Sequence, residues 1–570
     1  MKLNRLFSSL VLVCIALTSD AQYNNMWIPD TLSGTTFNLV EKDTFTQIVS
    51  GNQTITGGIN GSVWGPTLIW NKWATVHINV TNNLIDTTTV HWHGMHLPAI
   101  MDGGPHQLIP PGTTWSPYWQ ITNNAGTYWY HPHLCDSAVS QISSGLGGFI
   151  IIRDSIESAL ALPRTYKVDD IPLVLTDRKF DGSNQFVESP YGDSMLTNFT
   201  LRAQYSIPAQ VIRFRLLDAA IERSYNIGFS DGRTFYAIST DGGLLDTSVA
   251  LTRLQINPGE RYDILVNCTG QTGTSVDMMA YNASLPSSTG GGDLAPGSPF
   301  ANALARINFR ILHLNIVSAT AGAITTIPHS LTTNNFLSSA SANLTRNFTI
   351  SDSTGVPGTT GPTAFLLNHA LFNLNTINFT VPLNNTEIWK LTSTSNFSHP
   401  FHVHDVEFYI LSINGSPAPA YMQGWKDVVL VPTNQTVQFI AKYADYSDAL
   451  HPYMFHCHIA LHEDEGMMGQ FVVDGSTAVQ HIENPITDFT LFPNPATNRL
   501  YISLADATMQ VYYLRLLDAL GRTMLMLPKP ELMNGVDISG LAAGEYFVQV
   551  TDDKTKNTIT KKFIKVSHVQ

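Results

Sequence analysis

Short segments in which apolar and polar residues alternate recur along most of the chain. In the segment 75–81, Val76, Ile78 and Val80 alternate with polar residues. Alternating or apolar runs of similar length occur at 212–217, 263–266, 408–413 and 469–473. Gly, Pro, Asn and Thr interrupt these runs, and helical periodicity is scarce. The pattern is typical of strands packed as β-sandwiches, so we predict an all-β fold.

The 570 residues exceed what one hydrophobic core holds, which is rarely more than about 250–300 residues. Stretches rich in Ser, Thr, Gly and Pro at about 284–299 and 318–364 have the composition of loops or linkers. We therefore predict successive domains at 22–160, 161–340 with its linker, 341–480 and 487–570.

The first 21 residues have the composition of a secretory signal peptide. Lys2 and Arg5 precede an apolar run, and Ala21 stands before the expected cleavage point. The run is shorter than the roughly 20 apolar residues of a transmembrane anchor, and no later stretch is long enough. We expect an exported protein without a transmembrane segment, secreted or held at the cell surface.

Charge is sparse and acidic. Lys and Arg number 31 against 44 Asp and Glu, which gives a net charge of −13. This balance excludes a protein that binds nucleic acid by covering phosphates. The acidic excess lies in residues 22–486, with 20 basic and 35 acidic residues, whereas residues 487–570 hold nine and eight.

The C-terminal segment differs from the rest in its motifs as well. It opens on the sequence FPNP at 492–495, continues in strand-like runs at 500–504 and 511–516, and ends in GEYFVQV at 544–550 and KKFIKV at 561–566. This pattern resembles the C-terminal sorting domains of proteins exported by type IX secretion. The resemblance implies contact with that machinery and passage across an outer membrane. The alternative is an accessory β-sandwich.

Histidines are concentrated in four short clusters. Each cluster holds a pair of histidines two residues apart: His91 and His93, His131 and His133, His402 and His404, and His456 and His458. Residues two apart on a strand face the same side, so each pair can present two imidazoles to one site. Eight histidines are too many for one tetrahedral zinc ion.

Cys457 lies between His456 and His458 and faces away from both on a strand. Its thiolate can therefore join a second metal site. Two histidines, a cysteine and a weak axial methionine form the ligand set of a blue-copper centre, and His399, His462 and Met467 complete that set. Export leaves three cysteines, and this role accounts for the unpaired one. A disulfide between Cys135 and Cys268 stays an open alternative.

With these signatures in this order, residues 26–475 resemble a three-domain multicopper oxidase of the laccase-like, bilirubin and cuprous oxidase class. Further matching motifs are DGGP at 102–105, IPPG at 109–112, DGGLL at 241–245 and PGERYD at 258–263. The resemblance implies three cupredoxin-type Greek-key β-sandwiches before the C-terminal domain. No histidine lies between His133 and His313, so we expect the middle domain to act as a spacer without copper ligands.

The resemblance also implies four copper ions. A type 1 copper would be held by His399, Cys457 and His462 with axial Met467. A type 2 copper would be held by His91 and His402. A type 3 pair would be held by His93, His131, His133, His404, His456 and His458.

The implied activity is the one-electron oxidation of a reductant at the type 1 copper, coupled to the four-electron reduction of O₂ to water. Cys457 with His456 and His458 would connect the two sites, and Asp102 and Glu463 match acidic proton relays. Either acid could instead support a ligand or be a solvated charge. Asp427 could orient a type 1 ligand, touch substrate or form a structural salt bridge.

The reductant is open in the sequence, because variable loops build such pockets. We expect a monomeric, laccase-like oxidase of phenols or aromatic amines. A metallo-oxidase of Cu(I), Fe(II) or Mn(II) is the alternative, although a long Met-rich insertion is missing. A non-catalytic copper-binding protein is a remote one, since every ligand position is filled.

Overall fold

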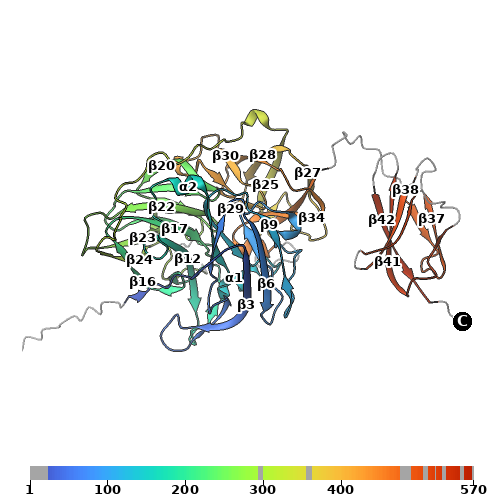
Figure 1. Cartoon of the computed structure of the whole chain (residues 1–570), viewed down its shortest axis with the longest axis horizontal. Helices are drawn as coiled ribbons and strands as arrows, with labels where there is room; N and C mark the ends of the chain where they lie inside the picture. The colour runs from blue at the N-terminus through green and yellow to red at the C-terminus, as the bar shows by residue number, and fades with distance from the viewer. Residues whose placement is uncertain are drawn as a thin grey trace, which may run out of the picture. The chain divides into compact units, whose positions relative to one another are not determined.

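The computed structural model describes residues 23–292, 300–354, 363–475, 489–504, 511–519, 522–528, 535–552 and 558–567. The predicted signal peptide lies outside this part of the chain. Strands dominate, and the α-helices of the described residues are three short ones: α1 (Ala138–Ser144), α2 (Ser155–Ala159) and α3 (Ala460–Asp464). The chain divides into two compact units, residues 1–476 and 477–570 (Figure 1). The predicted all-β class is confirmed.

The first sandwich of the larger unit is built from two five-stranded sheets. One sheet has the order β2 (Thr31–Ser33), β5 (Thr67–Asn71), β11 (Gly148–Arg153), β10 (Gly126–His131) and β7 (His91–His93). The other has the order β4 (Thr54–Ile59), β3 (Thr36–Thr46), β6 (Thr75–Asn83) and β8 (Thr114–Trp115), with β9 (Tyr118–Gln120) also on β6. The predicted alternation is confirmed in β6, where Val76, Ile78 and Val80 are fully buried.

The second sandwich has a six-stranded and an eight-stranded sheet. The six-stranded sheet has the order β1 (Asn24–Asn25), β16 (Ala203–Pro208), β24 (Asn308–Val317), β23 (Ser275–Tyr281), β18 (Tyr225–Phe229) and β21 (Leu254–Ile256). The eight-stranded sheet has the order β15 (Thr200–Leu201), β14 (Ser194–Thr197), β12 (Asp170–Phe180), β17 (Val211–Asp218), β22 (Arg261–Asn267), β19 (Phe235–Thr240) and β20 (Gly243–Leu251), with β13 (Phe186–Val187) on β12. Residues of both sheets share one core.

The third sandwich packs a six-stranded sheet against a five-stranded one. One sheet has the order β26 (Thr363–Leu367), β25 (Leu344–Thr354), β28 (Thr386–Ser393), β33 (Thr436–Lys442), β30 (Phe408–Ile413) and β31 (Trp425–Lys426). The other has the order β27 (Phe379–Pro382), β35 (Met468–Asp474), β34 (Asp448–Cys457), β29 (His399–Val403) and β32 (Val428–Val431). Buried aromatic side chains fill the space between the sheets, with Trp389, Phe401 and Phe439 fully buried. Each such burial contributes about 1.5–3 kcal/mol.

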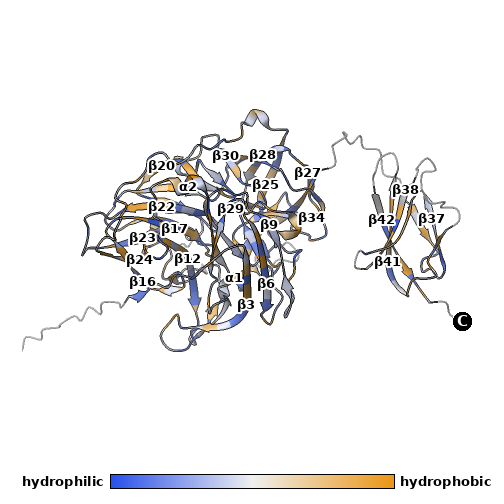
Figure 2. Ribbon diagram, viewed as in Figure 1, coloured by the Kyte–Doolittle hydropathy of each residue, from blue (hydrophilic) through white to orange (hydrophobic). Residues whose placement is uncertain are grey.

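The smaller unit has its own core and sheets. One sheet has the order β36 (Phe489–Phe492), β37 (Arg499–Leu504) and β40 (Val536–Asp537). The other has the order β39 (Thr523–Pro528), β38 (Val511–Asp518), β41 (Gly544–Asp552) and β42 (Thr558–Lys565). The strands predicted at 500–504, 511–516, 544–550 and 561–566 all occur. Figure 2 shows apolar residues in orange along β41 of this unit and along β34 of the larger unit.

Candidate metal centre

Two antiparallel strand pairs bring the histidine clusters together. In the first sandwich, β7 pairs with β10 so that His91 lies opposite His131. In the third sandwich, β29 pairs with β34 so that His402 lies opposite His456. Because partners in register are adjacent, each strand pair presents two histidine clusters at one end of a sheet.

The eight histidines of the four pairs form one buried cluster across the first and third sandwiches. The Nε2 atom of His456 lies 3.2 Å from Nε2 of His133 and 3.3 Å from Nε2 of His404. The Nδ1 atom of His93 lies 3.3 Å from Nε2 of His131 and 3.2 Å from Nε2 of His458. The clustering predicted from the sequence is therefore what the fold produces.

Three of these histidines have a buried ring nitrogen with no hydrogen-bond partner among the described residues: Nε2 of His91, Nε2 of His402 and Nδ1 of His133. Nδ1 of His133 still lies 3.2 Å from Glu463, so His91 and His402 are the informative pair. The other ring nitrogen donates to a backbone carbonyl, from His91 Nδ1 to Asp102 at 3.0 Å and from His402 Nδ1 to Asp427 at 2.8 Å. That bond leaves the lone pair of each Nε2 free, and a buried unpaired acceptor is costly unless a ligand satisfies it.

Burial also sets the protonation of the cluster. It lowers the pKa of His133 to about 4 and that of His456 to about 3, and it lowers the pKa of His402 and His404 well below the usual value of a histidine. Neighbouring histidines act in the same direction on His402 and His404 because like charges repel. Neutral imidazole is the form that binds metal ions, so the cluster fits a metal site.

A second group of potential metal ligands surrounds the side chain of Cys457, which faces away from the histidine cluster. The Sγ atom of Cys457 lies 3.5 Å from Nδ1 of His399 and 3.5 Å from Nδ1 of His462. Ser395 Oγ lies 2.9 Å from His399 Nε2, which fixes that ring. Met467 is fully buried, and its carbonyl accepts a hydrogen bond from the Cys457 amide. These residues fit the soft ligand set of a blue-copper site.

Two carboxylates bridge the sandwiches at the cluster. Asp102 Oδ2 lies 2.7 Å from Nδ1 of His404. Glu463 lies 3.2 Å from Nδ1 of His133 and 3.3 Å from Nδ1 of His456. Burial raises the pKa of Glu463, so its carboxyl holds a proton more readily than a solvated one does. Both predicted acids therefore touch histidines of the cluster.

Comparisons with known proteins point the same way. Two models of the multicopper oxidase family match residues 40–157 and 340–476, and a model of a secretion system C-terminal sorting domain matches 490–566. The multicopper oxidase mco of Staphylococcus haemolyticus is 28% identical over 438 residues, which are 75% of this chain and 86% of that protein. The chain belongs to the multicopper oxidase family.

Other relatives and solved structures extend this comparison. The cell division protein FtsP of Sodalis glossinidius is 29% identical over 74% of this chain and 86% of its own length. A laccase-like multicopper oxidase, CueO of Ochrobactrum sp., matches with 28% identity and a TM-score of 0.69, over 79% of this chain and all of that one. McoA of Aquifex aeolicus matches with 26% identity and a TM-score of 0.71, over 80% of this chain and all of that one.

Family membership makes this multicopper oxidase a copper-binding oxidoreductase with cupredoxin-type sandwiches. Its sorting domain points to type IX secretion. No helix of the described residues is long and apolar enough to span a membrane.

Some details of this multicopper oxidase differ from expectation. Both members of a histidine pair lie within a strand only in β7; the other pairs straddle a strand end, as in β10, which stops at His131. The open alternative of a disulfide between Cys135 and Cys268 is wrong, since Cys135, Cys268 and Cys457 are all free cysteines.

Of the roles predicted for Asp427, the structure shows the structural salt bridge, with Arg261 as its partner. Its carboxylate lies 3.1 Å from His93 in the histidine cluster, whereas the cysteine group had been one of its candidate sites. It also binds Arg261 of the second sandwich. The second sandwich, expected to be a spacer without copper ligands, thus also contacts a residue beside the histidine cluster. No local pattern signals this contact, because 334 residues separate Asp427 from His93.

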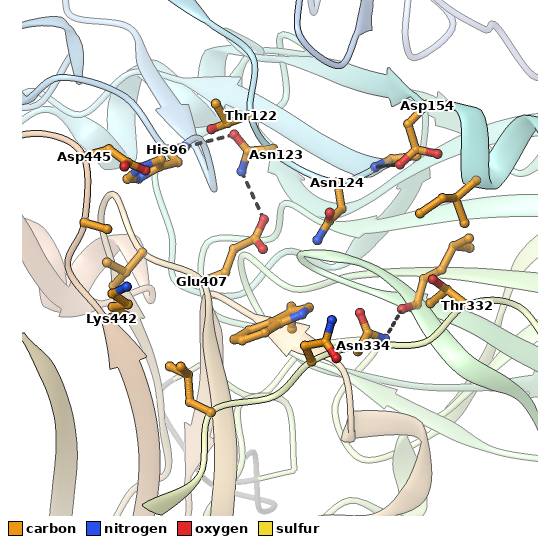
Figure 3. Close-up of a pocket in the computed structure, with 18 of the residues that line it drawn as sticks. His96, Thr122, Asn123, Asn124, Asp154, Thr332, Asn334, Glu407, Lys442 and Asp445 are labelled. Carbon is orange, nitrogen blue, oxygen red and sulfur yellow. Dashed lines mark hydrogen bonds and ion pairs between the residues drawn. The ribbon is translucent and has the colours of Figure 1, made fainter. Parts of the chain in front are cut away.

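A cavity of about 460 Å³ lies where parts of all three sandwiches meet (Figure 3). Asn123 links this cavity to the histidine cluster. Its side-chain amide donates to the carbonyl of Gly94, which is next to His93, and to Glu407. His96 lies between Asp405 and Asp445 at the rim. These ion pairs raise its pKa to about 9 despite its burial.

Proposed function

We propose that the protein is an exported oxidase that couples four one-electron oxidations of a small reductant to the reduction of O₂ to two waters. The observation that carries this proposal is the position of Cys457. Its side chain faces His399 and His462, while its sequence neighbours His456 and His458 belong to the histidine cluster. One strand end therefore serves two metal sites.

We assign the ligands as the family resemblance implies, with four copper ions. One copper ion would be held by His399, Cys457 and His462 with Met467, and a second by His91 and His402. Two further copper ions would be held by His93, His131, His133, His404, His456 and His458. When bound, copper supplies stepwise electron acceptance at the first group and O₂ reduction at the others.

The chain's own residues prepare these sites. Burial raises the pKa of the Cys457 thiol, so that it stays protonated until a metal ion displaces its proton. The peptide backbone then joins this sulfur to His456 and His458, which gives electrons a short covalent route. Burial of both groups also excludes bulk water, which limits the escape of partly reduced oxygen.

Asp102 and Glu463 would supply protons. Each carboxylate contacts one histidine of the first sandwich and one of the third: Asp102 contacts His91 and His404, and Glu463 contacts His133 and His456. Each is thus within one hydrogen bond of the cluster, the reach that proton transfer requires.

Aromatic side chains favour an organic reductant. The ring of Phe365 lies 4.1 Å from that of His462, and the ring of Phe397 lies 5.8 Å from it. An aromatic donor can stack on such a surface. We therefore propose phenols or aromatic amines as the substrate class, with Cu(I), Fe(II) and Mn(II) as the alternative reductants.

The test is O₂ uptake by the copper-loaded protein with a panel of phenols, aromatic amines, Cu(I), Fe(II) and Mn(II), compared by kcat/KM. We expect the highest values for phenols or aromatic amines. A higher value for a metal ion would favour the metallo-oxidase, and no uptake with any reductant would favour the non-catalytic copper protein.

The ligand assignment has a matched pair of variants. We expect Cys457→Ser to abolish the blue band at about 600 nm together with the oxidase activity. Cys268→Ser, which removes another buried thiol from the second sandwich, should retain both. A blue band that persists in Cys457→Ser would contradict the assignment.

A further inference from the structure

The second sandwich contacts the histidine cluster although no histidine of that cluster belongs to it. The loop before β22 carries Gly259, at φ +86°, and a Cβ atom there would lie 2.7 Å from the ring of His458. Arg261 follows at the start of β22 and is fully buried. Its guanidinium forms a bidentate pair with Asp427, with distances of 2.6 and 2.5 Å.

Arg261 is completely satisfied in this position. Its five N–H donors meet five acceptors: the two carboxylate oxygens of Asp427 and the carbonyls of Thr127, Gly259 and Asp241. A guanidinium with every donor bonded has one orientation, so it fixes the carboxylate that it binds. Lysine cannot reproduce this, because it has three donors and no planar fork.

Asp427 transmits that orientation to two histidines through different atoms. Its Oδ1 atom accepts from His93 Nε2 at 3.1 Å, and its backbone carbonyl accepts from His402 Nδ1 at 2.8 Å. The bond at Nε2 leaves His93 Nδ1 as the free nitrogen, and that atom faces His131 and His458. The bond at Nδ1 likewise leaves His402 Nε2 free.

The neighbouring Lys426 fastens the same segment to the second sandwich. Its ammonium lies 2.9 Å from Asp241, 2.9 Å from Glu260 and 3.2 Å from the Tyr262 hydroxyl, which matches three donors to three acceptors. All of these groups are fully buried. The contacts of Lys426 and the ion pair of Asp427 with Arg261 thus both hold this segment against the second sandwich.

The first sandwich closes the contact from the opposite side. Gly94 follows His93 and has φ +84°, and a Cβ atom there would lie 2.5 Å from Asp427 Oδ2 and 2.7 Å from Arg261 Nη2. Only glycine allows the chain to pass this close. Segments of the three sandwiches therefore meet at one ion pair beside two predicted copper ligands.

We propose that Arg261 and Asp427 are a positioning pair through which the second sandwich sets the tautomer and orientation of His93 and His402. The proposal rests on the proposed function, since it presumes that these histidines bind copper. It gives the middle sandwich a role in O₂ chemistry without a ligand of its own. It also accounts for the PGERYD motif at 258–263 and for the sequence GWKD at 424–427, whose residues make these contacts.

The experiment compares Arg261→Lys with Arg215→Lys after copper loading. Arg215 is the matched control because it is equally buried, forms a bidentate pair with Asp170 and also reaches Thr127 of the first sandwich. It contacts none of the predicted copper ligands. Copper ions per chain, competition with a copper chelator, and absorption are measured on the folded fraction.

For Arg261→Lys we expect a normal blue band at about 600 nm per chain, since Asp427 does not contact the cysteine group. Affinity for the remaining copper should fall about 10–100-fold, with a weaker shoulder at about 330 nm, as is typical when a partner of a metal ligand is lost. Arg215→Lys should keep wild-type copper content and spectrum even if its melting temperature falls.

Two results would overturn the proposal: full copper content and an unchanged shoulder in Arg261→Lys, or an equal loss in Arg215→Lys. If Arg261→Lys does not fold, Asp427→Asn serves in its place, because it keeps the volume while setting an amide against the guanidinium. Full copper content and an unchanged shoulder in Asp427→Asn would likewise overturn the proposal. A wild-type chain that binds no copper would instead refute the proposed function.

Discussion

The carboxylate of Asp102 lies 2.7 Å from Nδ1 of His404, although 302 residues separate the two along the chain. Asp102 belongs to the first sandwich and His404 to the third, so one hydrogen bond joins the two halves of the histidine cluster. Fixing Nδ1 leaves His404 Nε2 to face His456. This geometry suits the roles proposed for Asp102, which are to orient a copper ligand and to supply a proton.

Replacing Asp102 should impair the histidine cluster while leaving the cysteine group unchanged. We expect Asp102→Ala to lower kcat about 10–100-fold, because it removes both a partner of a metal ligand and a proton donor. The blue band should stay, since the cysteine group is not touched. Steady-state O₂ uptake and absorption measure the two effects. The exposed Asp86→Asn is the control, and equal kcat in both variants would contradict the role.

How far the sequence predicts this molecule depends on the range of each interaction. Alternation is local, and it predicts β6 and β30 correctly because one face of each strand packs in a core. The pairs of histidines are also local signals. By contrast, the contact of Asp427 with Arg261 and His93 joins three distant segments, and no short pattern contains such a contact.

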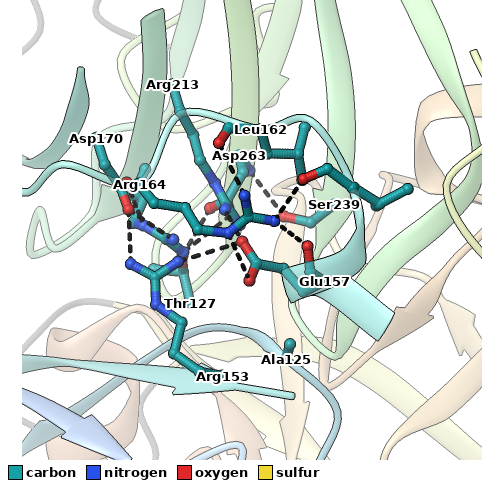
Figure 4. A network of polar contacts seen from close by, with 12 residues as sticks. Ala125, Thr127, Arg153, Glu157, Leu162, Arg164, Asp170, Arg213, Ser239 and Asp263 are labelled. Atoms are coloured by element: carbon teal, nitrogen blue, oxygen red, sulfur yellow. Dashed lines mark hydrogen bonds and ion pairs between the residues drawn. The ribbon is translucent and has the colours of Figure 1, made fainter. Parts of the chain in front are cut away.

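Buried charge between the first two sandwiches leads to a prediction about stability. Arg213 binds Glu157 at 2.7 Å and also pairs with Asp263, within the network of Figure 4. Arg213, Glu157 and Asp263 are all buried, so removing the cation takes one partner from each carboxylate. Glu157 keeps Arg153 and Arg164, and Asp263 keeps Arg215, so the network would be weakened but not dissolved. We expect Arg213→Ala to destabilise the protein by more than an exposed pair would, up to roughly 3–5 kcal/mol.

Thermal or denaturant unfolding measures that loss. The half-exposed Arg164, which also binds Glu157, provides the comparison. Arg164→Ala should cost no more than about 1 kcal/mol, because solvent screens a partly exposed pair. Equal effects of the two variants would show that burial of the network does not determine its contribution.

Glu41 should make stability depend on pH. It is fully buried, and desolvation raises its pKa from 4.5 to about 8. The folded chain thus keeps a proton that the unfolded chain releases, so stability is lost as the pH rises from about 4.5 through about 8. We expect Glu41→Gln to remove roughly 3 kcal/mol of the loss between about pH 5 and pH 8.

The measurement is the melting temperature of Glu41→Gln and of the wild type across this pH range. Glu188→Gln is the control, since that side chain is exposed and belongs to the same larger unit. The wild type and the control should lose stability in parallel toward high pH, while Glu41→Gln should lose less. Parallel curves for all three proteins would rule out Glu41 as the cause.

The sorting domain should be separable from the oxidase. Its core is made of residues between Phe489 and Phe563, and the three sandwiches have cores of their own. We expect a chain that ends at residue 476 to keep its copper content and kcat. In a bacterium with type IX secretion it should accumulate inside the outer membrane, as fractionation would show. Wild-type release of the shortened chain would contradict the role of the tail.

Met467 offers a test of the cysteine group that leaves the histidine cluster unchanged. It is fully buried, and its amide donates to the His462 carbonyl, which closes the short loop between two predicted ligands. A weak axial thioether stabilises the oxidised copper, so leucine at this position should raise the reduction potential. We expect Met467→Leu to keep the blue band, to show a higher midpoint in a redox titration, and to keep wild-type copper content. An unchanged midpoint would show that Met467 does not bind the axial position, whereas loss of the band would show that it is needed to hold the metal.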